Sequence, residues 1–554
     1  MRFTILFFTI LTFLACTNAA NAQTADRPRP AEWNNLVFGG RFMDRFLPMQ
    51  SMGQSTRDTW GADNVLPRYT GNGIENRKWS FWGGNIKVGE DGKYNLFVCG
   101  WLENSPKGHN EWPNSIVFHA VSEHSFGSFV VKDTIGKGHN PEVFKLKDGR
   151  YVLYVIDGYY LADGLNGPWK YSKFEFLNRD RKIIEGLSNL TFAQREDGSY
   201  LMVCRGGGVW ISETGLSSYN QVTEKRAYPP IEGRFEDPVV WRDNVQYNLV
   251  VNDWLGRIAY YLRSRDGLNW KVESGEAYMP GIARHEDGTV ESWFKLERMK
   301  VYQDSYGRAL QANFAVIDVE KKFDKANDIH SSKNIAIPLT VGRLLTILNK
   351  KQITSHTKTI SLKISAEPDF NPQTDIDLAT LRFGDPEEVN YGRGCKALKT
   401  EKSGRDLVVT FDGTCNGLKE DEFAAKLLGK TTGGKLLFGY ARLPGFDFVG
   451  PILSPRLPEI TPSETGFNLN VEVQNFGQVA SKNATIRIVY SLDGKDVTIA
   501  GGNVPKLKPY EKTTVGLTCG KIFGKGLEYK IAVLIHPDAK QPSMLHGKVT
   551  PVKK

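Results

Sequence analysis

The stretches Asp91-Gly-Lys-Tyr94, Asp148-Gly-Arg-Tyr151 and Asp197-Gly-Ser-Tyr200 repeat one pattern, and an apolar run lies on each side of every copy. Asp-Gly favours a tight turn, so each copy predicts a hairpin between two strands. Weaker copies follow at Asp243 and Asp304. The five copies recur at intervals of roughly 50 residues, the spacing expected for four-stranded propeller blades with insertions. The sequence therefore predicts a five-bladed β-propeller.

The composition agrees with an all-β protein. The chain has 554 residues, of which 40% are hydrophobic and 24% charged, as in globular rather than disordered proteins. A chain of this length is expected to contain several domains. Its 55 glycines and 11% aromatic residues favour many turns and many half-buried surfaces. A helical bundle is not expected.

The repeat occupies only part of the chain, and we assign the propeller to residues 23–340. Alternating stretches such as 358–364 predict a β-sandwich over residues 341–454. After the proline-marked linker 451–458, the strands of residues 455–554 resemble the CARDB-type immunoglobulin-like modules of bacterial surface proteins. The predicted fold class is all-β, with a five-bladed β-propeller followed by two β-sandwich domains.

Residues 1–22 have the features of a secretory signal. Arg2 gives a positive start, an apolar run follows, and Ala20-Asn21-Ala22 forms a small-residue cleavage site. The mature protein is therefore expected to be exported, to the periplasm or outside the cell. A rival interpretation makes Cys16 the lipid-bearing cysteine of a lipoprotein. No later segment has the roughly 18 consecutive apolar residues that cross a bilayer, so no further membrane segment is expected.

The six cysteines lack the paired spacing of a structural zinc site. In an exported protein Cys395 and Cys415 are candidates for a disulfide, with free thiols as the alternative. Nucleotide-binding and zinc-peptidase motifs do not occur. The net charge of +9 comes without a basic run and gives no case for nucleic acid. No cofactor or metal is expected, although a structural cation in the propeller channel stays open, as does the oligomeric state.

Polar side chains stand where each inner strand of the propeller is expected to begin. Inner strands line the central channel, so these side chains converge at one mouth. Burying them is costly unless they are paired or line a wet site, so the mouth is the expected functional site. These residues are Asn85, His139, Glu142, Asn189, Glu236, Asp237, Glu297 and Arg298.

Three segments, EDPVVW at 236–241, NDWLGR at 252–257 and KLERMKVYQD at 295–304, look like signatures of known enzymes. In them the chain resembles the five-bladed propeller glycoside hydrolases of families 43 and 117. The resemblance implies hydrolysis of a glycosidic bond by two carboxyl groups, one a general acid and the other a base or nucleophile.

Family 43 implies one acid in each of the first three blades. Here the first and third blades offer Asn85 and Asn189, and only Glu142 in the second keeps an acid. A mechanism of the family 43 type is therefore not carried over residue by residue.

Family 117 implies acids at the starts of blades four and five and a histidine in the loop before blade five. These correspond to Asp237, Glu297 and His285, which we take as the candidate catalytic residues. Glu142 and Glu236 are the alternative acids. The resemblance also implies exo-action on algal galactans that contain anhydrogalactose.

The expected partner is an oligosaccharide or polysaccharide. Tryptophan faces suit sugar rings, and arginines near the mouth can bind carboxylate or sulfate groups. The alternative for each tryptophan is core packing between blades. The candidate substrate-binding residues are Trp82, Asn85, His139, Asn189, Trp254, Arg257 and Arg298.

The catalytic candidates also have purely structural explanations. Asp237 precedes a proline and suits a turn, Glu297 and Arg298 suit an ion pair, and His285 suits an exposed loop. For the whole protein, the rival of an exported glycosidase is a catalytically inert glycan-binding propeller, because asparagines replace two acids. A second rival is a polysaccharide lyase that uses His and Tyr.

Overall fold

A computed structural model describes residues 26–56, 60–492, 495–524, 526–536 and 542–551, and the predicted signal segment 1–22 lies outside them. The described chain is nearly all β, which confirms the all-β part of the predicted fold class. None of its helices is long and apolar enough to cross a membrane. Its helical segments are α1 (Pro386–Asn390) and the 3-10 turns Ala31–Asn35, Phe42–Arg45, Asp63–Val65, Gly108–Asn114 and Gly413–Cys415.

Five sheets follow one another between Trp79 and Pro338, and the short pair β1 (Ser55–Thr56) and β2 (Arg68–Tyr69) precedes them. The first sheet consists of β3 (Trp79–Val88), β4 (Tyr94–Leu102), β5 (Ile116–Ser122) and β6 (Val130–Lys137). The second consists of β7 (Glu142–Lys145), β8 (Tyr151–Val155), β9 (Gly158–Ala162) and β10 (Lys170–Lys173). The third consists of β12 (Thr191–Gln194), β13 (Tyr200–Val203), β14 (Val209–Ser212) and β15 (Tyr219–Gln221), with β11 (Phe176–Leu177) at its edge. The fourth consists of β16 (Phe235–Arg242), β17 (Tyr247–Asp253), β18 (Ile258–Ser264) and β19 (Lys271–Val272). The fifth consists of β20 (Lys295–Gln303), β21 (Ala309–Ile317) and β22 (Ser332–Pro338).

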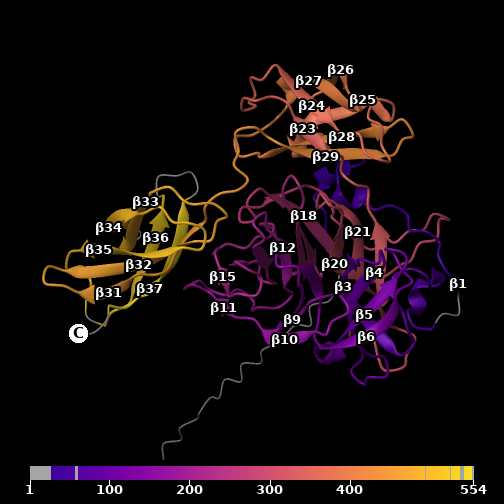
Figure 1. Ribbon diagram of the computed structural model, residues 1–554, viewed down its shortest axis with the longest axis horizontal. Helices are drawn as coiled ribbons and strands as arrows, with labels where there is room; N and C mark the ends of the chain where they lie inside the picture. Colours follow the sequence, from indigo (N-terminus) through magenta and orange to yellow (C-terminus); the bar gives the residue numbers. More distant parts are fainter. Residues whose placement is uncertain (1–25, 57–59, 493–494, 525, 537–541, 552–554) are drawn as a thin grey trace, which may run out of the picture.

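Each of the five repeated turns joins the first two strands of one sheet. In the three strong copies the aspartate side chain accepts a hydrogen bond from the backbone N–H two residues later, which is why Asp occupies that position. The first strands are neighbours: β3 contacts β7 and β20, and β16 contacts β12 and β20. Gln194 of β12 donates to the carbonyl of Lys145 in β7. Through these contacts the five first strands form a closed ring. Figure 1 shows three of them, β3, β12 and β20, lying in the same part of the molecule.

The segment before β3 packs on the fifth sheet. Isolated bridges join Phe46 to Leu339 and Ile74 to Asn334, and the Asn72 amide exchanges hydrogen bonds with the backbone of Ala336. The edge of β22 is covered in this way, which removes an unpaired strand edge.

Residues 345–442, which we call the second unit, form two sheets that share one apolar core. Ile360, Val409, Leu381 and Leu427 contribute to this core. The sheets are β23 (Leu345–Ile347), β24 (Thr359–Ile364), β27 (Asp406–Asp412) and β26 (Ala397–Ser403), and β25 (Ile376–Gly384), β28 (Ala424–Thr431) and β29 (Leu436–Arg442). Cys395 is buried, Cys415 is exposed, and both are free thiols, so the structure contains the alternative to the disulfide.

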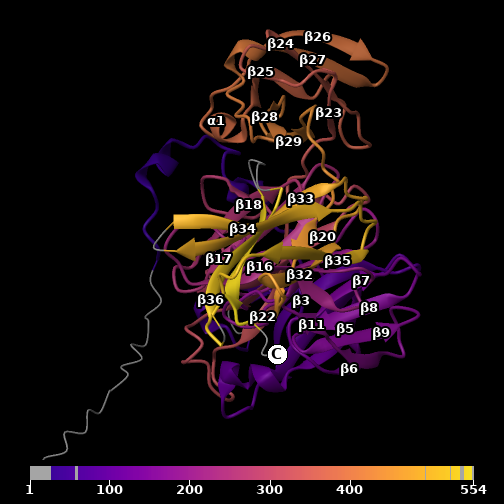
Figure 2. The same ribbon diagram turned by 90° about the vertical axis from the view of Figure 1, so that its left-hand side faces the viewer.

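A further pair of sheets encloses a separate core that includes Val471, Ile488 and Val533. Figure 1 shows this unit to the left of the ring of sheets, and in Figure 2, which views the molecule from that side, it lies in front of the ring. The sheets are β30 (Leu453–Pro455), β31 (Glu459–Pro462), β32 (Phe467–Asn475) and β35 (Lys512–Cys519), and β34 (Lys495–Val504), β33 (Ala484–Leu492), β36 (Tyr529–Ile535) and β37 (Ser543–Val549).

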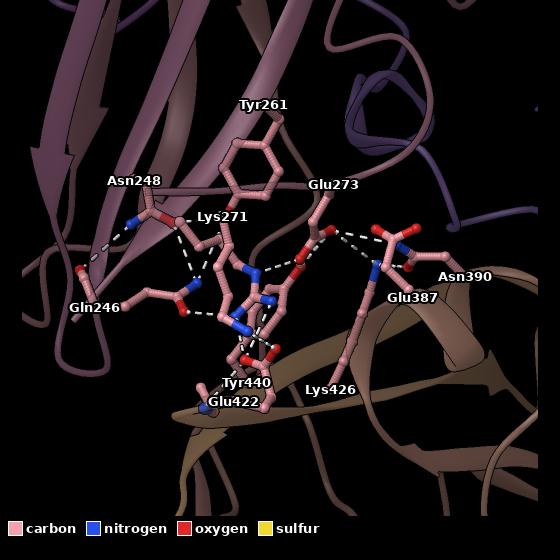
Figure 3. A network of polar contacts seen from close by, with 12 residues as sticks. Gln246, Asn248, Tyr261, Lys271, Glu273, Glu387, Asn390, Glu422, Lys426 and Tyr440 are labelled. Atoms are coloured by element: carbon pink, nitrogen blue, oxygen red, sulfur yellow. Dashed lines mark hydrogen bonds and ion pairs between the residues drawn. The ribbon is translucent and has the colours of Figure 1, made fainter. Parts of the chain in front are cut away.

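Buried charges hold the second unit against the fourth sheet. Arg263 of β18 is ion-paired with Glu273 on its own side and, at 3.3 Å, with Glu422 of the second unit. The Tyr440 hydroxyl bonds to Glu273, and the Lys426 ammonium lies 3.8 Å from the same carboxylate. Figure 3 shows Glu273, Glu422, Lys426 and Tyr440 meeting at the junction. The second unit is therefore tied to the ring of sheets by a desolvated network rather than by a flexible linker alone.

Arg263→Ala is expected to destabilise the protein by about 3–5 kcal/mol, because it removes the buried guanidinium that two buried carboxylates share and leaves each with only a lysine partner. Chemical denaturation followed by fluorescence measures the loss. Arg405→Ala, which removes an exposed arginine of the second unit, is the matched control and should change stability little. Equal stability of the two variants would contradict a network that holds the junction.

Candidate functional site

One backbone feature recurs at the start of all five first strands. A residue with φ between 53° and 58° stands there in each case, namely Gly83, Asn140, Asn189, Asp237 and Arg298. In β3, β16 and β20 the strand register shifts at the same point, as in a β-bulge. The bulge turns neighbouring side chains out of the strand alternation, so polar groups of five strands gather at one mouth of the ring. We call this set of side chains the mouth. Its members are Asn140, Glu142, Asn189, Glu236, Asp237, Lys295, Glu297, Arg298 and Lys300, together with Arg205 and Lys321 from loops.

Asp237 is bonded through one of its two carboxylate oxygens. Its Oδ1 forms an ion pair with the Arg298 Nε at 2.9 Å and accepts a hydrogen bond from the Asn189 amide at 3.0 Å. Asn189 also donates to Glu236, at 2.8 Å, and accepts from the Arg298 Nη2 at 2.6 Å. Among the described residues, none makes a hydrogen bond to Oδ2 of Asp237. This second oxygen is the atom that can carry a transferable proton.

The protonation of Asp237 differs from that of an ordinary aspartate. Burial raises the pKa of Asp237 to about 7, against the effect of Arg298, and the nearby Glu236 and Glu297 raise it further. The residue is 4% exposed. Near neutral pH Asp237 is therefore divided between the acid and the carboxylate, as a general acid must be.

Glu297 has the opposite electrostatic character. Its Oε2 accepts from the Lys321 ammonium at 2.5 Å, and its Oε1 lies 3.6 Å from Lys295. Burial alone would raise its pKa, but Lys321 and Lys295 together hold the pKa of Glu297 below its usual value. Glu297 is thus an ionised carboxylate in the same mouth as the protonatable Asp237.

Two further polar positions of the first strands, Glu142 and Asn85, join neighbouring parts of the ring. Glu142 is ion-paired with Lys300, which also donates to the Thr191 hydroxyl at 3.3 Å. Burial raises the pKa of Glu142 despite Lys300. The Asn85 side chain bonds to both backbone groups of Val143 and so joins the first two sheets. These contacts give Asn85 and Glu142 a structural role in the ring.

The aromatic and histidine candidates of the first two sheets form a buried cluster. The His139 Nδ1 lies 2.9 Å from the Ser115 hydroxyl, and its ring packs on Trp112. Burial lowers the pKa of His139 well below its ordinary value, so the ring is neutral. Trp82 is buried, and the Lys321 ammonium stands 5.0 Å from the centre of its ring. Trp82 therefore faces a cation of the mouth.

A small pocket lies beside the mouth, and it contains two of the predicted substrate-binding residues. Trp254 and Arg257 line it, and Lys295 stands 4.9 Å from the centre of the Trp254 ring. Its other lining residues include Asn252, which pairs with Glu236 in the sheet. The pocket provides an aromatic face and two cations next to the carboxylates.

His285 lies apart from these groups. Its Nε2 is 2.9 Å from Glu291, its Nδ1 is 3.3 Å from the carbonyl of Gln50, and its ring packs on Tyr69. No described contact joins it to Asp237 or Glu297. The loop histidine is thus buried beneath the N-terminal segment rather than exposed, and its assignment as a catalytic residue stays a prediction.

Sequence reasoning missed several residues of the mouth. Lys321 comes from the loop after β21, and no strand pattern marks it. Lys295 and Lys300 stand in the same stretch as Glu297, where alternation along a strand could have placed them. Asn140 could have been found as a residue that tolerates the left-handed backbone. Within the described residues, no group of three or more His, Cys, Asp or Glu side chains is placed to hold a metal ion.

No protein-family model matches the chain, and no curated protein matches it either. Solved structures align at low scores. An α-L-arabinofuranosidase from Lactobacillus brevis is 12% identical, over 48% of this chain and 92% of its own, with a TM-score of 0.33. A thermostable family-43 glycoside hydrolase is 13% identical, over 52% of this chain and 94% of its own, with a TM-score of 0.31. A family-43 protein from Bacillus licheniformis is 9% identical, over 86% of this chain and 90% of its own, with a TM-score of 0.32. Scores of this size assign neither a family nor a reaction to this chain.

Asp237→Asn is expected to change how stability depends on pH. Between its ordinary value of 3.8 and about 7, the unfolded chain ionises Asp237 while the folded protein keeps it protonated. The folded wild type therefore loses stability as pH rises through this window, by about 1.4 kcal/mol for each unit by which the pKa is raised. The melting temperature of the variant minus that of the wild type should grow from pH 4 to pH 7.

Thermal unfolding at a series of pH values measures this difference. Asp157→Asn, at an exposed position, is the matched control and should follow the wild type. A difference between Asp237→Asn and the wild type that stays constant with pH would show that Asp237 is an ordinary ionised aspartate.

Proposed function

We propose that the protein is an exported glycoside hydrolase whose active site is the mouth of a five-bladed propeller. Asp237 is the general acid, and Glu297 is the carboxylate that stays ionised. The observation that supports this proposal is the divergence of two neighbouring carboxyl groups, because the pKa of Asp237 is raised to about 7 while that of Glu297 is lowered. Two carboxyl groups with opposed protonation are what glycoside hydrolysis uses.

In this proposal the proton on Asp237 goes to the glycosidic oxygen as the bond to the leaving sugar breaks. The negative charge of Glu297 then stabilises the positive charge that develops on the remaining sugar ring. A water molecule adds its oxygen to that ring and gives one proton to Asp237, which restores the acid. Glu236 is the alternative second carboxylate, since its side chain is 18% exposed and bonds to the same Asn189. Trp254 offers the face on which a sugar ring packs.

The depth of the acids supports exo-action. Asp237 is 4% exposed and Glu297 is 1% exposed, so a chain end can approach them more easily than the middle of a polymer. The resemblance to families 43 and 117 points to a complex polysaccharide of the anhydro-galactan type. Export to the periplasm or the cell exterior, with or without a lipid on Cys16, is proposed from residues 1–22. The two C-terminal units are proposed as β-sandwich accessory domains, the last of the CARDB type.

Asp237→Asn and Glu297→Gln are each expected to lower the rate of glycoside cleavage by at least roughly a hundredfold, the usual contribution of acid–base groups. Purified protein is incubated with marine and plant oligosaccharides, and released sugars are read by mass spectrometry. Asp157→Asn and Glu213→Gln, at exposed positions, are the matched controls. Wild-type activity should fall as pH rises above about 7, because Asp237 loses its proton. Undiminished cleavage by both mouth variants would refute the assignment.

A catalytically inert glycan-binding protein is the second candidate, and one observation favours it. Each buried carboxylate of the mouth is bonded to a cation, as in the pairs Asp237–Arg298, Glu142–Lys300 and Glu297–Lys321. Such pairing can serve structure alone. Retained binding of an oligosaccharide without any product on prolonged incubation would select this candidate. Products with an ultraviolet-absorbing double bond would instead select a lyase.

A further inference from the structure

The mouth contains more positive than negative side chains. At its centre Arg298 pairs with Asp237 and Lys300 with Glu142, while Lys295 and Lys321 share Glu297. Four cations therefore face three carboxylates there, and one positive charge is left over. Glu236 is paired separately with Arg205, whose side chain is 36% exposed and also lies 3.9 Å from Glu185. The positive charge left over at the centre favours the binding of an anion.

Lys321 is the cation of this set that a ligand can reach at the centre of the mouth. Its side chain is 30% exposed, whereas those of Lys295, Arg298 and Lys300 are 5% exposed or less. An ammonium group has three N–H donors, and the contact with Glu297 uses one of them. The others are available above Trp82, over which the ammonium stands.

Unpartnered polar atoms lie in the same mouth. The Nη1 of Arg298 and both side-chain polar atoms of Asn140 are buried and have no hydrogen-bond partner in the described structure. Asn140 and Arg298 flank Gly83: a methyl group on Gly83 would meet the Asn140 Oδ1 at 3.2 Å and the Arg298 Cβ at 3.9 Å. Buried groups of this kind are almost always satisfied in the functional state of a protein.

We propose that the mouth binds an anionic oxygen group of the sugar, a carboxylate or a sulfate ester, through Lys321, Arg298 and Asn140. The free donors of Lys321 meet the group first, and the flexible lysine side chain then lets it reach the Arg298 Nη1 and the Asn140 Nδ2. The surplus charge is neutralised and the unpartnered donors are satisfied in one step. This inference rests on the proposed function, because it takes the mouth as the glycan site, and it adds the substrate class.

Binding to matched pairs of probes tests the proposal. The probes are a galacturonic acid trisaccharide and its methyl ester, and a sulfated galactan tetrasaccharide and its desulfated form, titrated calorimetrically at low salt. At least one charged member should bind roughly tenfold more tightly than its neutral counterpart. A difference in the first pair identifies a carboxylate, and one in the second pair a sulfate. Equal binding within both pairs, or no binding of either charged probe, would overturn the proposal.

Variants show which residues cause the preference for charged probes. Lys321→Gln should remove the ratio of affinities between the charged probe and its neutral counterpart, whereas Lys322→Gln, at the neighbouring and more exposed lysine, should keep that ratio. Asn140→Asp should also remove it, by placing a negative charge beside Arg298. Its matched control is Asn327→Asp, at an exposed position with the same left-handed backbone. A preference that survives both mouth variants would place the anion elsewhere.

Mass spectrometry of the same samples separates this inference from the proposed function. Charged probes that bind preferentially without forming product would contradict hydrolysis but retain the anion site. Product formed equally from charged and neutral probes, with equal affinity, would retain hydrolysis and refute the anion site.

Discussion

The ion pair between Arg298 and Asp237 is the interaction on which the mouth depends. Arg298 reaches from the fifth sheet to Asp237 in the fourth and, through Asn189, to the third. One guanidinium thus holds three first strands in a fixed relation. It also opposes the effect of burial on the pKa of Asp237 without cancelling it, which leaves that pKa at about 7. The same contact therefore has a structural and an electrostatic consequence, and neither can be altered without the other.

Local chemistry made the sheets predictable from sequence. The Asp-Gly turns stand where a side chain can accept from the backbone two residues later, so the neighbouring residues alone were enough to place the hairpins. The polar residues at the strand starts were also found, because a polar residue next to a buried strand is unusual. Asp237, Glu297 and Arg298 were recognised in this way as members of one mouth.

Long-range contacts were not predictable in the same way. Lys321 enters the mouth from a loop, and His285 is buried by the N-terminal segment through Gln50 and Tyr69. Nothing in the local sequence of either residue records its partner. The left-handed backbone conformation of Arg298 could not be predicted from sequence either, because arginine rarely adopts it. The surrounding fold has to stabilise it. The residues that sequence reasoning missed are those whose position is set by another part of the fold.

The N-terminal segment also constrains how the chain reaches its final shape. Asn72 bonds to the backbone of Ala336, which lies 264 positions further along the chain. The segment before β3 can therefore take its final place only after the last strand of the fifth sheet has formed. Contacts of such long sequence separation slow folding, because the loop between them must be ordered first. Because synthesis proceeds from the N-terminus, the edge of β22 cannot meet its partner segment until residue 336 has been made, and strand edges that stay unpaired until then can pair with other chains.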